Sequence, residues 1–132
     1  MIIVYNRVKP HTCFRGPYQS GIMKMMAIGL AKQAGAENCH AQGYELLPQN
    51  IKMFGQAIID NSKMLFAVAT VENAYDETCE IKVIHRDNVA EEEPRLLNQA
   101  ARLMPRILVD DCDVLIVDEI GKNLAVTVWI LI

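Results

Sequence analysis

An apolar run at residues 64–71, with the sequence MLFAVATV, places the strongest constraint on how this chain folds. Eight uncharged residues that end abruptly at Glu72-Asn73 are typical of a strand buried on both faces. Such a strand requires further layers of structure on either side of its sheet. Residues 2–5 predict a second short buried strand, and the alternating pattern at 78–84 predicts a strand nearer an edge of the sheet.

Helical periodicity occupies much of the remaining sequence. The first helix is expected over residues 20–34, with Ser20 as its N-cap and Gly35 as its end. Further helices are expected at 48–60 and 88–104, and apolar segments at 114–117 and 124–132 predict two more strands. The expected order is β-α-α-β-β-α-β-β. The sequence therefore predicts an α/β or α+β fold, a layered mixed β-sheet flanked by helices.

Composition indicates one globular domain and excludes several classes of function. The chain has 132 residues, of which 52% are hydrophobic, and its formal net charge is −3. This balance argues against general nucleic-acid binding, and no apolar run is long enough to span a membrane. The four cysteines form no C-x-x-C pair, so a zinc ribbon is not expected. Free thiols instead favour a reducing, cytoplasmic location.

Charge is distributed unevenly along the chain. Residues 1–36 contain no acidic side chain, whereas residues 37–132 contain all 16 acidic residues and eight of the 13 basic ones. Basic side chains in a loop that precedes a helix suit a phosphate or carboxylate ligand. The other interpretation is that these cations pair with the acidic remainder at the surface. The candidate anion-binding residues are Arg7, Lys9, Arg15 and Lys24.

Two histidines and one lysine are candidates for chemistry. His11 follows the first strand, where a general base could act at the edge of the sheet, or it could simply cap loop backbone. His40 is either a surface residue or a metal ligand. Lys24 is either a snorkelling surface lysine or a partly desolvated reactive amine. His85-Arg86 has no partner in the sequence and is expected at the surface.

Two pairs of polar residues end apolar strands and could face the same edge as the basic loop. They are Glu72-Asn73 and Asp118-Glu119. A carboxylate at that edge could orient an imidazole or an ammonium group, or could only solvate the strand end and cap a helix.

Four longer motifs resemble a known family. They are NRVKPHT at 6–12, FRGPYQSGIMKM at 14–25, VENAYDET at 71–78 and DVLIVDEIGKN at 113–123. Together they are similar to the nickel-pincer-dependent lactate racemase family, in particular to its homologues of unassigned substrate. The resemblance covers residues 2–124, and family members are around three times as long. It therefore implies that the chain is an internal piece of a larger enzyme.

The resemblance implies an isomerase that acts on 2-hydroxyacids by hydride transfer to a nickel-pincer nucleotide. Lys24 corresponds to the lysine that carries the cofactor, His40 to the nickel ligand and His11 to one of two histidine bases. Arg7, Lys9 and Arg15 would supply the basic pocket for the cofactor phosphate. The second base and the substrate arginine would lie upstream, so the fragment itself is expected to be inactive. Cys13 stands where this subgroup has aspartate, and Lys122-Asn123 belongs to a motif of unassigned role.

The last eight residues depart from the family pattern, which continues SGDGMDPN where this chain reads AVTVWILI. One possible coding of the family residues, AGC GGT GAC GGT ATG GAT CCT AAT A, yields this tail when it is read one base later. Residues 125–132 are therefore interpreted as a frameshift product after a partial domain at 1–124. Because an unpaired apolar strand can associate with a second copy, a homo-oligomer is a further expectation. The alternative function is a non-catalytic module that binds a phosphate- or carboxylate-bearing ligand or a protein partner.

Overall fold

A three-stranded mixed sheet forms the centre of the computed structural model, which describes residues 1–11, 13–106, 113–114 and 116. The strands are β1 (Ile2–Arg7), β2 (Met64–Glu72) and β3 (Thr78–His85). Their order is β1-β2-β3, with β1 parallel to β2 and β2 antiparallel to β3. This arrangement confirms the predicted α/β or α+β class with a mixed sheet.

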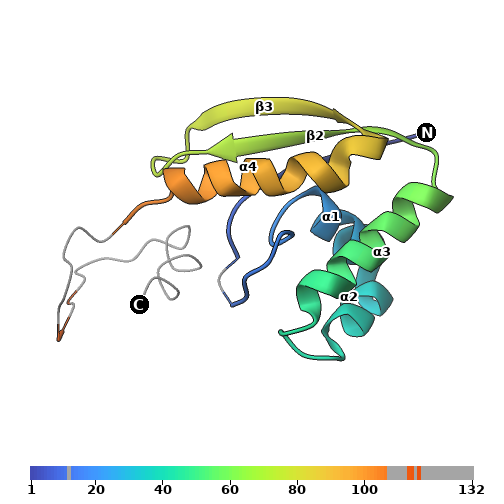
Figure 1. Cartoon of the computed structure of the whole chain (residues 1–132), viewed down its shortest axis with the longest axis horizontal. Helices are drawn as coiled ribbons and strands as arrows, with labels where there is room; N and C mark the ends of the chain where they lie inside the picture. The colour runs from blue at the N-terminus through green and yellow to red at the C-terminus, as the bar shows by residue number, and fades with distance from the viewer. Residues whose placement is uncertain (12, 107–112, 115, 117–132) are drawn as a thin grey trace.

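The parallel pair β1 and β2 is joined through a series of helical segments. These are α1 (Ile22–Lys24), the π-helix η1 (Met25–Leu30), α2 (Lys32–His40) and α3 (Leu47–Asn61). After β3 come the short 3₁₀ helix η2 (Arg86–Asn88) and α4 (Val89–Leu103). Figure 1 shows α4 running along the β2–β3 hairpin, with α1 beneath the N-terminal half of α4 and with α2 and α3 further from the sheet. The helices expected at 48–60 and 88–104 are confirmed to within a few residues.

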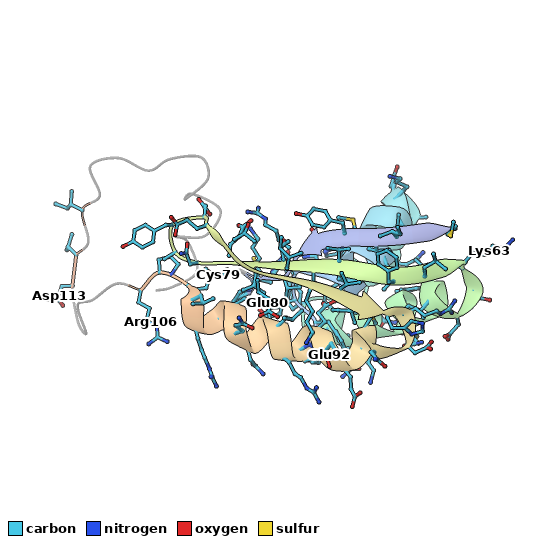
Figure 2. All side chains as sticks on the ribbon, turned by 90° about the horizontal axis from the view of Figure 1, so that it is seen from above. Lys63, Cys79, Glu80, Glu92, Arg106 and Asp113 are labelled. Carbon is cyan, nitrogen blue, oxygen red and sulfur yellow. The ribbon has the colours of Figure 1, made fainter. Side chains whose placement is uncertain are left out.

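The helices cover one face of the sheet, and the other face is open in the described part of the chain. On the covered face, Ala67 and Ala69 of β2 are buried, and such small side chains let a helix approach the strand closely. On the open face, Ile3 is 54% and Val83 65% exposed. The prediction that the apolar strand at 64–71 is buried on both faces is therefore wrong, because no described element covers its outer side. Figure 2 gives the view from above, with Lys63 and Cys79 toward opposite ends of the hairpin.

The first helical segment differs from the prediction of one helix at 20–34. It begins at Ile22, and the chain breaks between η1 and α2 where Lys32 adopts a φ of 57°. Gly35 does not end a helix but lies within α2, buried, where an added Cβ would come within 2.2 Å of the Ala31 Cβ. This glycine is required for close packing between successive turns rather than for termination.

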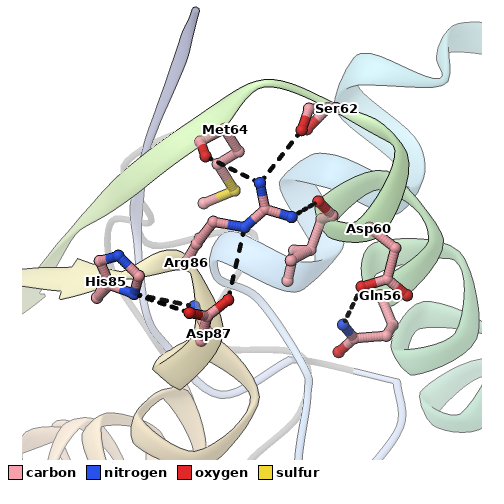
Figure 3. Close-up of polar contacts among 8 residues, drawn as sticks. Gln56, Asp60, Ser62, Met64, His85, Arg86 and Asp87 are labelled. Atoms are coloured by element: carbon pink, nitrogen blue, oxygen red, sulfur yellow. Dashed lines mark hydrogen bonds and ion pairs between the residues drawn. The ribbon is translucent and has the colours of Figure 1, made fainter.

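Arg86 was expected at the surface but is half-buried at the end of α3. Its guanidinium donates to the carbonyl oxygens of Ile59, Ser62 and Met64, with the last two at 3.3 Å (Figure 3). Carbonyl groups at a helix C-terminus lack partners within the helix. Arg86 therefore caps α3 and fixes the chain as it turns into β2.

The expected strand at 114–117 is not present at its two described residues. Val114 and Ile116 belong to no strand and are 75% and 84% exposed. An apolar segment forms a strand only where it can pair with a neighbouring strand, and neither residue pairs with the sheet. The rest of that segment, Asp118-Glu119, Lys122-Asn123 and the tail at 124–132 lie outside the described residues.

Candidate functional site

The loop between β1 and α1 is fixed by backbone contacts at both ends. The Val8 N–H donates to the Thr70 carbonyl at 2.8 Å, so the loop begins beside β2. Lys9 and Ser20 then exchange two backbone hydrogen bonds, at 2.9 and 3.2 Å. Ser20 was expected to cap the first helix with its side chain, but its backbone closes this loop instead. Closure brings the end of β1 against the start of α1.

His11 is held within this loop. Its N–H donates to Gln19 Oε1 at 2.7 Å, its carbonyl accepts from Arg15 at 2.6 Å, and its ring lies 4.3 Å from the Phe14 ring. Nδ1 accepts from the Cys13 N–H at 3.1 Å, so the neutral ring carries its proton on Nε2. His11 therefore has no free lone pair in this conformation, and it could act as a base only after the contact with the Cys13 amide opens.

Lys24 lies close to the same aromatic residue. Its Nζ is 5.3 Å from the centroid of the Phe14 ring, in a cation–π position. Burial lowers the pKa of the half-buried Lys24 ammonium. Burial, and next the charge of Lys24, lower the pKa of His11 to about 4. At neutral pH His11 is therefore uncharged, and Lys24 has more free amine than an exposed lysine.

His40 occupies the last position of α2. Its Nδ1 lies 2.7 Å from the Ala36 carbonyl oxygen, which can only accept, so the neutral tautomer that suits this contact has its proton on Nδ1 and a lone pair on Nε2. A backbone carbonyl that holds one imidazole nitrogen in this way is the usual support for a metal-ligating histidine. His40 also contributes to the lowered pKa of His11, so the two rings lie within electrostatic range of each other.

A cavity of about 320 Å³ opens between the end of β1 and the segment α1–η1. Three of the predicted basic residues line it, whereas Arg15 does not: its guanidinium donates to the carbonyls of His11 and Phe14 within the loop. The lining residues are Asn6, Arg7, Lys9, Ser20, Lys24, Met25, Ile28 and Gly29. The cavity combines cationic, amide and hydroxyl groups with an apolar wall, which suits an anionic ligand with an apolar part.

The two strand-end residues Glu72 and Asn73 have different roles. Glu72 accepts from Arg7 at 2.6 Å and therefore reaches the expected edge of the sheet. Asn73 instead shapes the turn that follows β2, where its Oδ1 accepts from the backbone of Tyr75 and Glu77. Of these two residues, only Glu72 contacts one of the predicted anion-binding residues, Arg7.

The described residues contain no group of three or more histidine, cysteine or acidic side chains that could hold a metal ion. His40 alone offers an imidazole nitrogen whose orientation is fixed for ligation by a backbone contact. The family resemblance implies one protein ligand to nickel, with the others supplied by the cofactor. Among the described residues, His40 presents one imidazole nitrogen of this kind, which is compatible with a single protein ligand.

Sequence reasoning missed a buried carboxylate that contacts the residue before Lys24. Glu93 of α4 is 1% exposed, and its Oε2 accepts from the Met23 N–H at 2.8 Å. The sequence pattern held a signal for it, because residue 93 falls on the same helical face as Val89, Leu96 and Ala100, all of which are buried. Glu93 also belongs to a run of three glutamates, 91–93, near the N-terminus of α4, where the helix dipole favours carboxylates.

No helix in the described ranges combines the length and apolar character needed to cross a lipid bilayer. Comparison of the chain with protein-family models, with curated proteins and with solved structures finds no match.

Proposed function

We propose that this chain is part of a 2-hydroxyacid racemase or epimerase that uses a nickel-pincer nucleotide attached to Lys24. One observation carries the proposal. Of the three residues that the family resemblance singles out, Lys24 and His40 each lie within electrostatic range of His11, although they come from two helical segments and His11 from a loop. A half-buried amine with a lowered pKa is the form of lysine suited to covalent attachment.

Each residue has a distinct part in this proposal. Arg7 and Lys9, in the cavity beside Lys24, would bind the cofactor phosphate, and His40 Nε2 would ligate nickel. His11 would take the substrate hydroxyl proton once Nδ1 releases the Cys13 amide. The cofactor, when bound, supplies the hydride acceptor. We place the enzyme in the cytoplasm, and we expect the fragment by itself to be inactive.

The direct test is production of an intact version together with the cofactor-building enzymes. We expect a covalent mass increase on the peptide that contains Lys24, with nickel present in stoichiometric amount. Lys24→Ala should abolish both, whereas Lys52→Ala, which removes an exposed lysine of α3, should retain them. A full-length protein with neither adduct nor nickel would overturn the proposal.

The cavity itself favours a second candidate, a non-catalytic module that binds a small anion. Arg7, Lys9 and Lys24 would hold a phosphate or carboxylate group without any metal. The test is titration of the isolated chain with inorganic phosphate and with lactate, followed by NMR or calorimetry. The double variant Arg7→Ala, Lys9→Ala should abolish binding, and Lys52→Ala should not. An unchanged affinity in the double variant would overturn this candidate.

A further inference from the structure

The segment that carries Lys24 begins against a buried acid from a distant part of the chain. Glu93 lies 70 residues after Met23, yet its Oε2 accepts from the Met23 N–H at 2.8 Å. Gly21 fits directly against the same carboxyl group, because a Cβ at that position would be 2.6 Å from Glu93 Oε1. Glu93 of α4 and Gly21, which precedes α1, therefore pack directly against each other.

The start of α1 has little support from its own sequence. Gly21 occupies the N-cap position and offers no side chain, so no local group accepts from the first amides of the helix. The Gly21 carbonyl accepts two hydrogen bonds, from Asn6 Nδ2 at 2.9 Å and from the Met25 N–H at 3.0 Å. Glu93 supplies the acceptor that a cap residue would normally provide.

We propose that Glu93 is a positioning residue for Lys24, and that it acts as a hydrogen-bond acceptor for the Met23 amide rather than as a charge. This role rests on the proposed function only in treating Lys24 as the attachment site. Lys24 directly follows the residue that Glu93 holds. Loss of the acceptor would let the start of α1 move and would release Lys24 from its half-buried position above Phe14.

The surroundings of Glu93 agree with an acceptor role. Burial raises the pKa of its carboxyl to about 7, and the amides of Met23 and Ile22 offset part of this rise. Tyr18 is the titratable neighbour: its hydroxyl donates to the Ala90 carbonyl at 2.8 Å, and burial followed by the charge of Glu93 raises its pKa. Near neutrality Glu93 is present in both protonation states, and each retains a carboxyl oxygen that can accept from Met23.

The experiment measures the reactivity of the Lys24 amine in the 132-residue chain without any cofactor. An acylating reagent, N-succinimidyl acetate, is applied between pH 6 and pH 10, and peptide mass spectrometry follows Lys24 relative to the exposed Lys52. Glu93→Gln keeps a carbonyl acceptor, and Glu93→Leu has similar size without one. Leu97→Ala, on the buried face of the same helix, controls for loss of stability alone.

We expect Glu93→Leu to raise the pKa of Lys24 toward its ordinary value and to slow its labelling at pH 8 by about threefold or more. Glu93→Gln and Leu97→Ala should stay within about twofold of the wild type. If Glu93→Leu does not fold, Gly21→Ala replaces it, since the added methyl displaces the carboxyl group and should slow labelling equally.

Two results would overturn this role. One is an unchanged Lys24 profile in a folded chain that lacks the acceptor, and the other is an equal loss in Glu93→Gln. Because no cofactor takes part, these outcomes are independent of whether the intact enzyme acquires an adduct on Lys24.

Discussion

Replacement of Glu93 by glutamine should change how the stability of the protein depends on pH. The folded state holds the Glu93 proton with a pKa of about 7, against an ordinary value of 4.5. Between these values the folded state binds more protons than the unfolded state, so the free energy of unfolding falls as pH rises through this window. The two pKa values differ by about 2.5, and each unit is worth about 1.4 kcal/mol, so over the full range Glu93 contributes a fall of about 3.5 kcal/mol.

His11 acts in the opposite direction over part of the same range. Its folded pKa of about 4 lies below the ordinary 6.5, so its contribution to stability rises with pH between these values. The wild type and Glu93→Gln share this contribution, and the comparison between them isolates Glu93. The glutamine NH₂ has no acceptor at the position of Oε1, so the variant is expected to be less stable at pH 5.

Urea denaturation followed by circular dichroism at pH 5 and pH 8 measures the effect. We expect the difference in unfolding free energy between the two pH values to shift by about 2.5 kcal/mol in Glu93→Gln relative to the wild type, which is less than the full fall because the unfolded carboxyl is still titrating near pH 5. The control is Glu91→Gln, an exposed position on the same helix, which should leave the difference unchanged. An identical pH dependence in the wild type and Glu93→Gln would refute the reasoning.

Three further substitutions test packing and surface contacts by thermal or urea denaturation. Arg86→Ala removes the group that binds three carbonyls at the end of α3 and should lower the free energy of unfolding by about 2–4 kcal/mol. Arg86→Lys should recover part of this stability. An equal loss in both variants would argue against the carbonyl contacts. Gly35→Ala should cost about 2 kcal/mol or more, since its methyl meets the Ala31 Cβ; a neutral effect would contradict the packing described. Arg7→Ala should cost less than about 1 kcal/mol, because its ion pair with Glu72 is largely solvated, and a larger loss would show that Arg7 has a role in the fold itself.

Periodicity in the sequence was enough to find most of the elements. The apolar run at 64–71 and the alternation at 78–84 correspond to β2 and β3, and the helical patterns correspond to α3 and α4. These segments succeed because burial of one face is encoded within each of them. The first helix was predicted less well, since its start and its interruption at Lys32 are set by contacts with other segments.

The residues missed by sequence reasoning share one property: their partners are distant in the chain. Arg86 appeared to have no partner, but it binds carbonyls more than 20 residues away. Glu93 lies in a run of three glutamates, and its partner is 70 residues away. No local pattern identifies such a partner, although a charged residue on an apolar helical face indicates that one must exist. Arg15 shows the opposite pattern. It was predicted to bind an anion, but its guanidinium donates to a backbone carbonyl within its own loop.

The position of Lys24 follows from the same dependence on distant contacts. A three-residue α1 that continues into a π-helix is too short to be stable by itself. It is held by Asn6 of β1 and by Glu93 of α4, so the position of the lysine depends on contacts with both elements. All of these residues lie within 6–93. The half-buried position of this lysine therefore depends on contacts between segments that lie up to 70 residues apart in the chain.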